Sequence, residues 1–99
     1  MLKQARVKIK GDVIGVGFRA WTKIHAKMLG ITGWVRNVYD QEEYYGKGGG
    51  VEALIQGEED KYSEMIKLLE KGPEISRVDD TEFYEQEPKE IIEGFEIRK

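Results

Sequence analysis

Apolar and polar residues alternate along the first segment of the chain and then change period. Every second residue from 5 to 9 is apolar within the segment 4–10, which predicts a strand with one buried face. Residues 18–29 instead place apolar side chains three or four positions apart, which predicts a helix with Gly30 as its C-terminal cap. The stripe predicted for the buried face of this helix consists of Trp21, Ile24, His25 and Met28.

The pattern then predicts two strands, a second helix and two further strands. Residues 31–39 and 51–56 form the second and third predicted strands. Residues 58–71 form the second predicted helix, whose apolar stripe consists of Tyr62, Met65, Ile66 and Leu69. Residues 77–84 predict a fourth strand, whose mixed alternation is typical of a sheet edge or a bulge, and residues 95–98 predict a short fifth.

These elements follow one another in the order strand, helix, strand, strand, helix, strand. Two split strand-helix-strand units of this kind predict an α+β protein with a ferredoxin-like α/β sandwich, in which two helices cover one face of an antiparallel sheet. The 99 residues suffice for one hydrophobic core, so we expect a single domain over residues 1–99. The polar segment 40–50 contains four glycines and is expected to be a flexible connection between the second and third strands.

The composition excludes several kinds of site. The chain has no cysteine, which excludes disulfides, thiolate catalysis and cysteine-ligated metals. Its only histidine, His25, lies within the apolar stripe of the first predicted helix, where we expect it to pack rather than to act as a general base. No apolar run approaches the roughly 20 residues of a membrane span, and no signal segment follows Met1. We therefore expect a cytoplasmic protein that binds no membrane.

Charge is distributed unevenly along the chain. Residues 1–36 carry eight basic side chains and one acidic side chain, whereas residues 37–99 carry eight basic and eighteen acidic ones. The basic first third favours an anionic ligand. Mutual neutralisation of the two segments in the folded chain explains the same asymmetry equally well.

A glycine-rich stretch, GDVIGVGFRAW, spans residues 11–21 between the first predicted strand and the first predicted helix. Within it, residues 15–20 match the G-x-G-x-x-G/A pattern of dinucleotide-binding turns. The chain is too short for the two halves of such a domain, and its predicted hairpin topology lacks the crossover to a parallel strand. RNA binding on this order of elements needs aromatic residues on the two central strands, and residues 6–10 and 51–56 have none. Neither a dinucleotide nor a nucleic acid is therefore expected as the ligand.

The same stretch is suited to a smaller anion. Glycines allow successive backbone N–H groups to converge, and a helix that begins near Phe18 adds the positive end of its dipole. The planar guanidinium of Arg19 can bind two oxygens of one phosphate. The stretch therefore predicts a cradle for a single phosphate group.

Two motifs, separated by the first predicted helix, carry a family resemblance. They are GDVIGVGFR, which begins at residue 11, and GWVRN, which begins at residue 33. Together they resemble the paired signature of the acylphosphatases, small ferredoxin-like enzymes that hydrolyse acyl phosphates. The similarity continues in the same order through VE at residue 51, QG at 56, GP at 72, SRV at 76 and FEIR at 95. It therefore covers nearly the whole chain.

The resemblance implies an enzyme that hydrolyses the carboxyl–phosphate bond of an acyl phosphate to a carboxylate and inorganic phosphate. By this resemblance, Arg19 binds the phosphate and Asn37 orients the attacking water. The backbone amides that complete the cradle are those of Ile14, Gly15, Val16, Gly17 and Phe18. No metal or cofactor is implied, because an acyl phosphate is an activated anhydride whose own phosphate oxygens can accept the proton. The expected ligands are a small acyl phosphate and the phosphate or sulfate ion, bound by a monomer.

The sequence departs from the family pattern in three places. Ile14 stands where a glutamine is common before Gly15, and Asp12 places a negative charge near the expected anion site, where it would weaken binding. The connection between Asn37 and Val51 is longer than the tight turn of the family. Two alternatives stay open at this point: a non-catalytic anion-binding or regulatory module on the same fold, and a role in handling carbamoyl phosphate.

Overall fold

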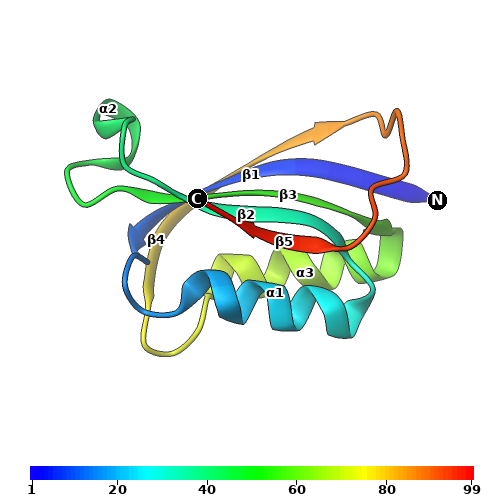
Figure 1. The fold of residues 1–99 in the computed structure, drawn as a ribbon, viewed down its shortest axis with the longest axis horizontal. Helices are drawn as coiled ribbons and strands as arrows, with labels where there is room; N and C mark the ends of the chain where they lie inside the picture. The colour runs from blue at the N-terminus through cyan, green and yellow to red at the C-terminus, as the bar shows by residue number, and fades with distance from the viewer.

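Five strands and three helices follow one another in the computed structural model of the chain, which describes residues 1–99. Their order is β1 (Leu2–Asp12), α1 (Phe18–Leu29), β2 (Thr32–Val38), α2 (Glu42–Tyr45), β3 (Gly50–Glu58), α3 (Glu59–Lys71), β4 (Arg77–Gln86) and β5 (Phe95–Arg98). The strands form one sheet, with α1 and α3 on one face and the single turn of α2 on the other (Figure 1). None of the helices combines the length and the apolar character needed to cross a lipid bilayer.

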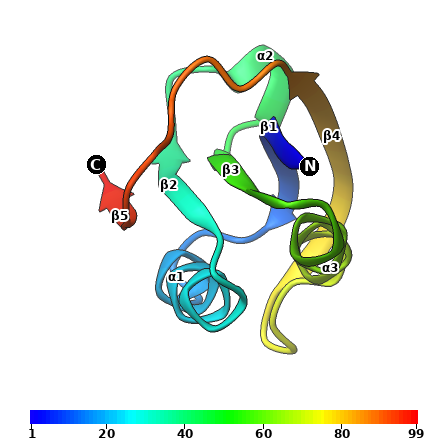
Figure 2. The same cartoon turned by 90° about the vertical axis from the view of Figure 1, so that its right-hand side faces the viewer.

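The strands lie in the order β4-β1-β3-β2-β5 across the sheet. The first four pair antiparallel with their neighbours, as in a ferredoxin-like fold, which confirms the predicted architecture. β5 pairs parallel with β2. The sheet is therefore mixed, whereas the sequence predicts a purely antiparallel sheet. The chain leaves β4, crosses the sheet on the face opposite α1 and α3, and returns at the far edge (Figure 2). β4 is antiparallel to β1, so the chain runs in the direction of β1 once it has turned back after β4. β2 has the same direction as β1, and β5 therefore pairs parallel with β2.

The positions of the strands explain their patterns. β1 and β3 lie inside the sheet, and their alternate residues are fully buried: Ala5, Val7, Ile9, Val51, Ala53 and Ile55. β4 lies at the edge beside β1, and its pairing shifts register between Lys10 and Gly11. The mixed alternation of residues 77–84 predicts an edge strand or a bulge, and both are present.

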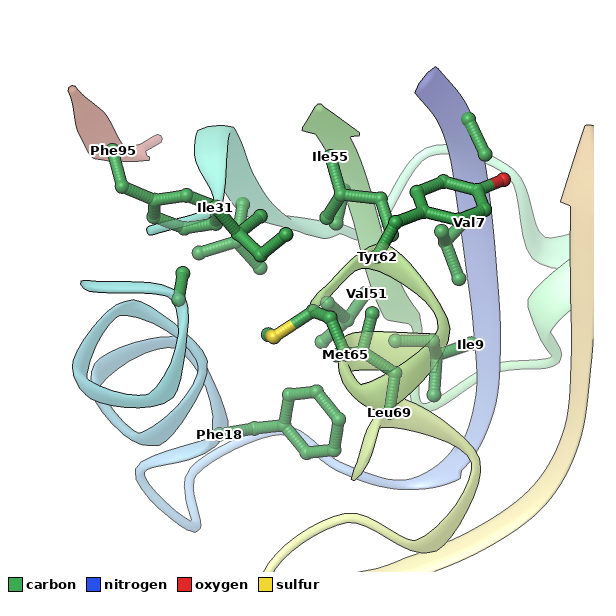
Figure 3. Close-up of a cluster of buried hydrophobic side chains, with 14 of the residues drawn as sticks. Val7, Ile9, Phe18, Ile31, Val51, Ile55, Tyr62, Met65, Leu69 and Phe95 are labelled. Carbon is green, nitrogen blue, oxygen red and sulfur yellow. The ribbon is translucent and has the colours of Figure 1, made fainter. Parts of the chain in front are cut away.

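The hydrophobic core fills the space between the sheet and the two long helices (Figure 3). α3 contributes Tyr62, Met65 and Leu69, and Ile66 packs against them partly buried, as the predicted stripe requires. Phe18 begins α1 and is 1% exposed within the same cluster. This burial fixes the start of α1, and with it the end of the glycine-rich loop.

The buried face of α1 differs from the predicted one. Ile24 and Met28 of the predicted stripe are 58% and 74% exposed, whereas Phe18, Thr22 and Ala26 are buried. Thr22 tolerates burial because its hydroxyl donates a hydrogen bond to the Phe18 carbonyl oxygen at 2.8 Å. The small side chain of Ala26 allows the helix to lie close to the sheet. The predicted stripe of α1 is therefore wrong: the helix is rotated about its axis, so that a different face packs against the sheet.

Residues 40–50, for which the glycines predict a flexible connection, fold back onto the sheet. They contain α2, and Tyr45 at its end is 8% exposed. Burial raises the pKa of Tyr45 to about 12 and also raises the pKa of Tyr44. The ammonium groups of Lys8 and Lys10 lie 4.9 and 4.0 Å from the centre of the Tyr44 ring. Two aromatic side chains therefore fix where this segment lies.

Candidate active site

The connection between β1 and α1, residues 13–17, turns twice on glycine. Gly15 and Gly17 have φ angles of 77° and 75°, in the left-handed region that other residues rarely adopt, while Val16 between them does not. Such alternation makes successive N–H groups converge toward one point. The loop is anchored by its apolar side chains, since Val13 is buried and Ile14 and Val16 pack partly buried against the core. Its backbone is therefore held in a fixed position.

The backbone N–H groups of residues 14–20 donate to no backbone acceptor. The first amide of this region with such a partner is that of Trp21, which donates to the Gly17 carbonyl oxygen at 3.0 Å. The amides of residues 18–20 are free because the first turn of a helix has no preceding turn to bond to. Free N–H groups and the positive end of the α1 dipole together favour an anion at this position.

The guanidinium of Arg19 has no carboxylate partner. Its Nη1 donates to the main-chain carbonyl oxygen of Arg98 at 3.4 Å, and none of the ion pairs of the chain involves it. By contrast, Arg6 and Arg36 both pair with the buried Glu52, at 2.9 and 2.6 Å. The charge asymmetry of the sequence is thus partly neutralised in the fold, while Arg19 keeps its charge for a ligand.

A pocket of about 170 Å³ opens beside the loop. Arg19 on α1 and Asn37 on β2 both line it, and β5 adds Ile97. The other lining residues come from the loop and the start of α1: Val13, Gly15, Gly17, Phe18 and Ala20. Sites for drug-sized ligands typically enclose roughly 300–1,000 Å³, so this pocket suits a phosphate group better than a dinucleotide.

Strand β2 brings Asn37 to the pocket. Asn37 lies near the end of the strand, opposite Val51 on β3. It lies two positions after Val35, which is buried in the core, so both side chains lie on the face covered by α1. The Nδ2 of Asn37 donates a hydrogen bond to the Tyr39 hydroxyl at 3.1 Å. Two residues predicted from separate motifs, Arg19 and Asn37, therefore line one pocket.

Three of the residues expected near the anion contribute no lining atoms to the pocket. Ile14 and Val16 have free amides but do not line the pocket. Asp12 does not line it either and pairs in register with Arg77 on β4, whose pKa it helps to raise after the larger effect of Asp79. The sequence did not point to Ile97, because nothing in the four residues of β5 predicts parallel pairing with β2.

Other candidate chemistry lies away from the pocket. The ring of His25 packs on α1 with its centre 4.7 Å from that of Trp21, and it does not line the pocket. No group of three or more histidine or carboxylate side chains is placed to hold a metal ion. Arg19 lines the pocket with its positive charge, and the free backbone amides of the loop lie beside it.

Comparison with known proteins decides the family. The family model described as acylphosphatase matches residues 5–97. The chain belongs to the acylphosphatase family. An acylphosphatase of Caldivirga maquilingensis is 42% identical to it over 95 residues, which are 96% of this chain and 93% of the relative. The crystal structure of the Bacillus subtilis acylphosphatase matches with a TM-score of 0.84 at 30% identity, over 100% of both chains.

A third similar protein is much longer. Full-length HypF, solved in a phosphate- and nucleotide-bound form, matches with a TM-score of 0.83 at 26% identity, over 100% of this chain but 12% of that one. The acylphosphatases of similar length match instead over most of their own chains. The family model and the acylphosphatases of similar length confirm the predicted activity: the protein is an enzyme that hydrolyses acyl phosphates to a carboxylate and inorganic phosphate.

Proposed function

We propose that the pocket between residues 13–17, α1 and β2 is where this acylphosphatase hydrolyses its substrate. The observation that carries the proposal is the convergence of free backbone amides, an arginine without a carboxylate partner and an asparagine on one small pocket. The phosphate of the substrate lies in the cradle formed by the amides of residues 14–18. The guanidinium of Arg19 binds two of its oxygens.

The main task of the cradle is to stabilise charge. During transfer of a phosphoryl group to water, negative charge spreads over the three equatorial oxygens of phosphorus. Amides held by the glycine turns and by the first turn of α1 already converge there, so they stabilise this charge without reorganisation. The leaving group is a carboxylate, a weak base that departs without a general acid.

Asn37 orients the attacking water. Its carboxamide reaches the pocket from β2, whereas the cradle comes from the loop and α1. A carboxamide that binds the water holds its oxygen in line with the bond that breaks. A proton of the water passes to an oxygen of the substrate phosphate, so no histidine or carboxylate base takes part. The water oxygen ends in inorganic phosphate, and the bridging oxygen stays with the carboxylate.

The ligands and the setting of the enzyme follow from this site. The substrate is a small acyl phosphate, and inorganic phosphate and sulfate bind the same cradle. Residues 1–99 supply every proposed site residue and act as one catalytic domain, in an enzyme that we expect to be a monomer. We place the enzyme in the cytoplasm, where proteins without disulfides are the rule, with neither nucleic acid nor membrane as a partner.

Release of phosphate from benzoyl phosphate by the purified protein tests this function. We expect saturable hydrolysis, competitive inhibition by phosphate and sulfate, and an unchanged rate after treatment with EDTA, because Arg19 and backbone amides supply the positive charge. The ester p-nitrophenyl phosphate has a more basic leaving group and should react far more slowly. Loss of activity in EDTA would contradict the proposed chemistry, and phosphate binding without turnover would support the non-catalytic alternative.

A further inference from the structure

The Tyr39 side chain lies beside the pocket without lining it. Its hydroxyl oxygen accepts the hydrogen bond from Nδ2 of Asn37 at 3.1 Å. The residue is 65% exposed and takes no part in the hydrophobic core. It also lies outside both signature motifs of the sequence. The contact therefore lies outside the hydrophobic core, and it ends on a residue that lines the pocket.

We propose that Tyr39 is a positioning residue for Asn37. The inference rests on the proposed role of Asn37 in orienting water. The terminal torsion of an asparagine side chain is broad and roughly two-fold, so an unrestrained carboxamide places its oxygen and nitrogen variably. The bond from Nδ2 to the Tyr39 hydroxyl restrains this torsion and leaves the carboxamide oxygen for the water. A water held by a restrained group reaches the reactive geometry more often.

Gly49 of the segment 40–50 lies close to the Tyr39 ring. Gly49 has a φ of 78°, and a Cβ added to it would lie 2.5 Å from the Val38 carbonyl oxygen and 3.2 Å from Cδ1 of Tyr39. The backbone at Gly49 therefore packs directly against the end of β2 and against the ring. This gives the long connection a role in the site: it supports the ring whose hydroxyl holds Asn37.

Steady-state kinetics of the Tyr39→Phe variant with benzoyl phosphate test the proposal. The phenyl ring keeps its contact with Gly49, and only the hydroxyl is lost. Loss of one hydrogen bond predicts a fall in kcat of about three- to tenfold. The KM and the inhibition constant of inorganic phosphate should stay unchanged, because Tyr39 is not part of the cradle. An unchanged kcat, or a rise in KM in place of a fall in kcat, overturns the proposal.

The Asn37→Ala background separates this proposal from the proposed function. In that background, Tyr39→Phe should have no further effect on kcat, and an added loss of the same size overturns the role of Tyr39. Wild-type kcat in Asn37→Ala itself overturns the proposed role of Asn37. A loss in Asn37→Ala with wild-type kcat in Tyr39→Phe overturns only the role of Tyr39.

Tyr84→Phe is the matched control. Tyr84 is an exposed tyrosine on β4 whose hydroxyl donates to Glu82, and it does not line the pocket. The variant removes the same hydroxyl group from the same type of residue. We expect its kcat and KM to equal those of the wild type, and a loss equal to that of Tyr39→Phe would show that the effect is not specific to Asn37, against the proposal.

Discussion

Replacement of Arg19 by alanine is expected to lower kcat/KM for benzoyl phosphate by about three orders of magnitude. Hydrogen bonds to charged groups each contribute about 1.5–3 kcal/mol, and the guanidinium is proposed to make two of them to the phosphate, which gives about 4 kcal/mol and a factor of about 10³. The loss should include weaker inhibition by inorganic phosphate, since Arg19 also binds the product. The measurement is a comparison of initial rates with the wild type.

Two variants distinguish this role from a general effect of charge. Arg19→Lys keeps the charge without the planar fork and should lie between the wild type and Arg19→Ala. Lys27→Ala removes an exposed cation from the last turn of the same helix and should leave kcat/KM within about twofold of the wild type, as surface charges are screened at this range. The midpoint of thermal unfolding of Arg19→Ala, Arg19→Lys and Lys27→Ala should be similar to that of the wild type. An Arg19→Ala enzyme within tenfold of the wild type would contradict the proposed phosphate contact.

Replacement of Asn37 by alanine is expected to lower kcat by about 10²-fold with little change in KM. Misplacement of a reacting group by about 1 Å can lower a rate by that factor, and the variant removes the group proposed to place the water. The cradle of amides and Arg19 remains, so the inhibition constant of inorganic phosphate should also remain. Measured kcat, KM and product inhibition together separate this effect from that of Arg19→Ala.

Thr32→Ala is the control for Asn37→Ala on the same strand. Thr32 begins β2, and its hydroxyl donates to the Gln56 carbonyl oxygen at 3.4 Å, away from the pocket. This variant should keep wild-type kcat. If Asn37→Ala raises KM as much as it lowers kcat, Asn37 binds the substrate in the ground state, and its proposed role with water is wrong.

Sequence patterns predict the sheet and the loop because both follow from local chemistry. Alternation along residues 4–10 and 51–56 corresponds directly to the two faces of the inner strands. The glycine-rich loop is recognisable because positive φ angles at Gly15 and Gly17 depend on residue type. The family motifs also single out Arg19 and Asn37, and the structure brings both to one pocket. Their catalytic roles stay predictions.

Other features depend on contacts between distant parts of the chain and could not be predicted. The α1 stripe does not reveal which face packs, since Thr22 is buried through a hydrogen bond within its own helix. The glycines of segment 40–50 do not reveal that Tyr45 is buried against the sheet. Ile97 reaches the pocket only through the parallel pairing of β5 with β2.

Hydrolysis of benzoyl phosphate in H₂¹⁸O tests most directly whether the cradle holds the phosphate while water attacks phosphorus. The products of the enzymatic reaction are analysed by mass spectrometry and corrected for hydrolysis without enzyme. Attack at phosphorus places the labelled oxygen in inorganic phosphate and leaves the benzoate unlabelled, which is the result we expect. Label in the benzoate reports attack on the acyl carbon and would contradict a site built to transfer the phosphoryl group to water.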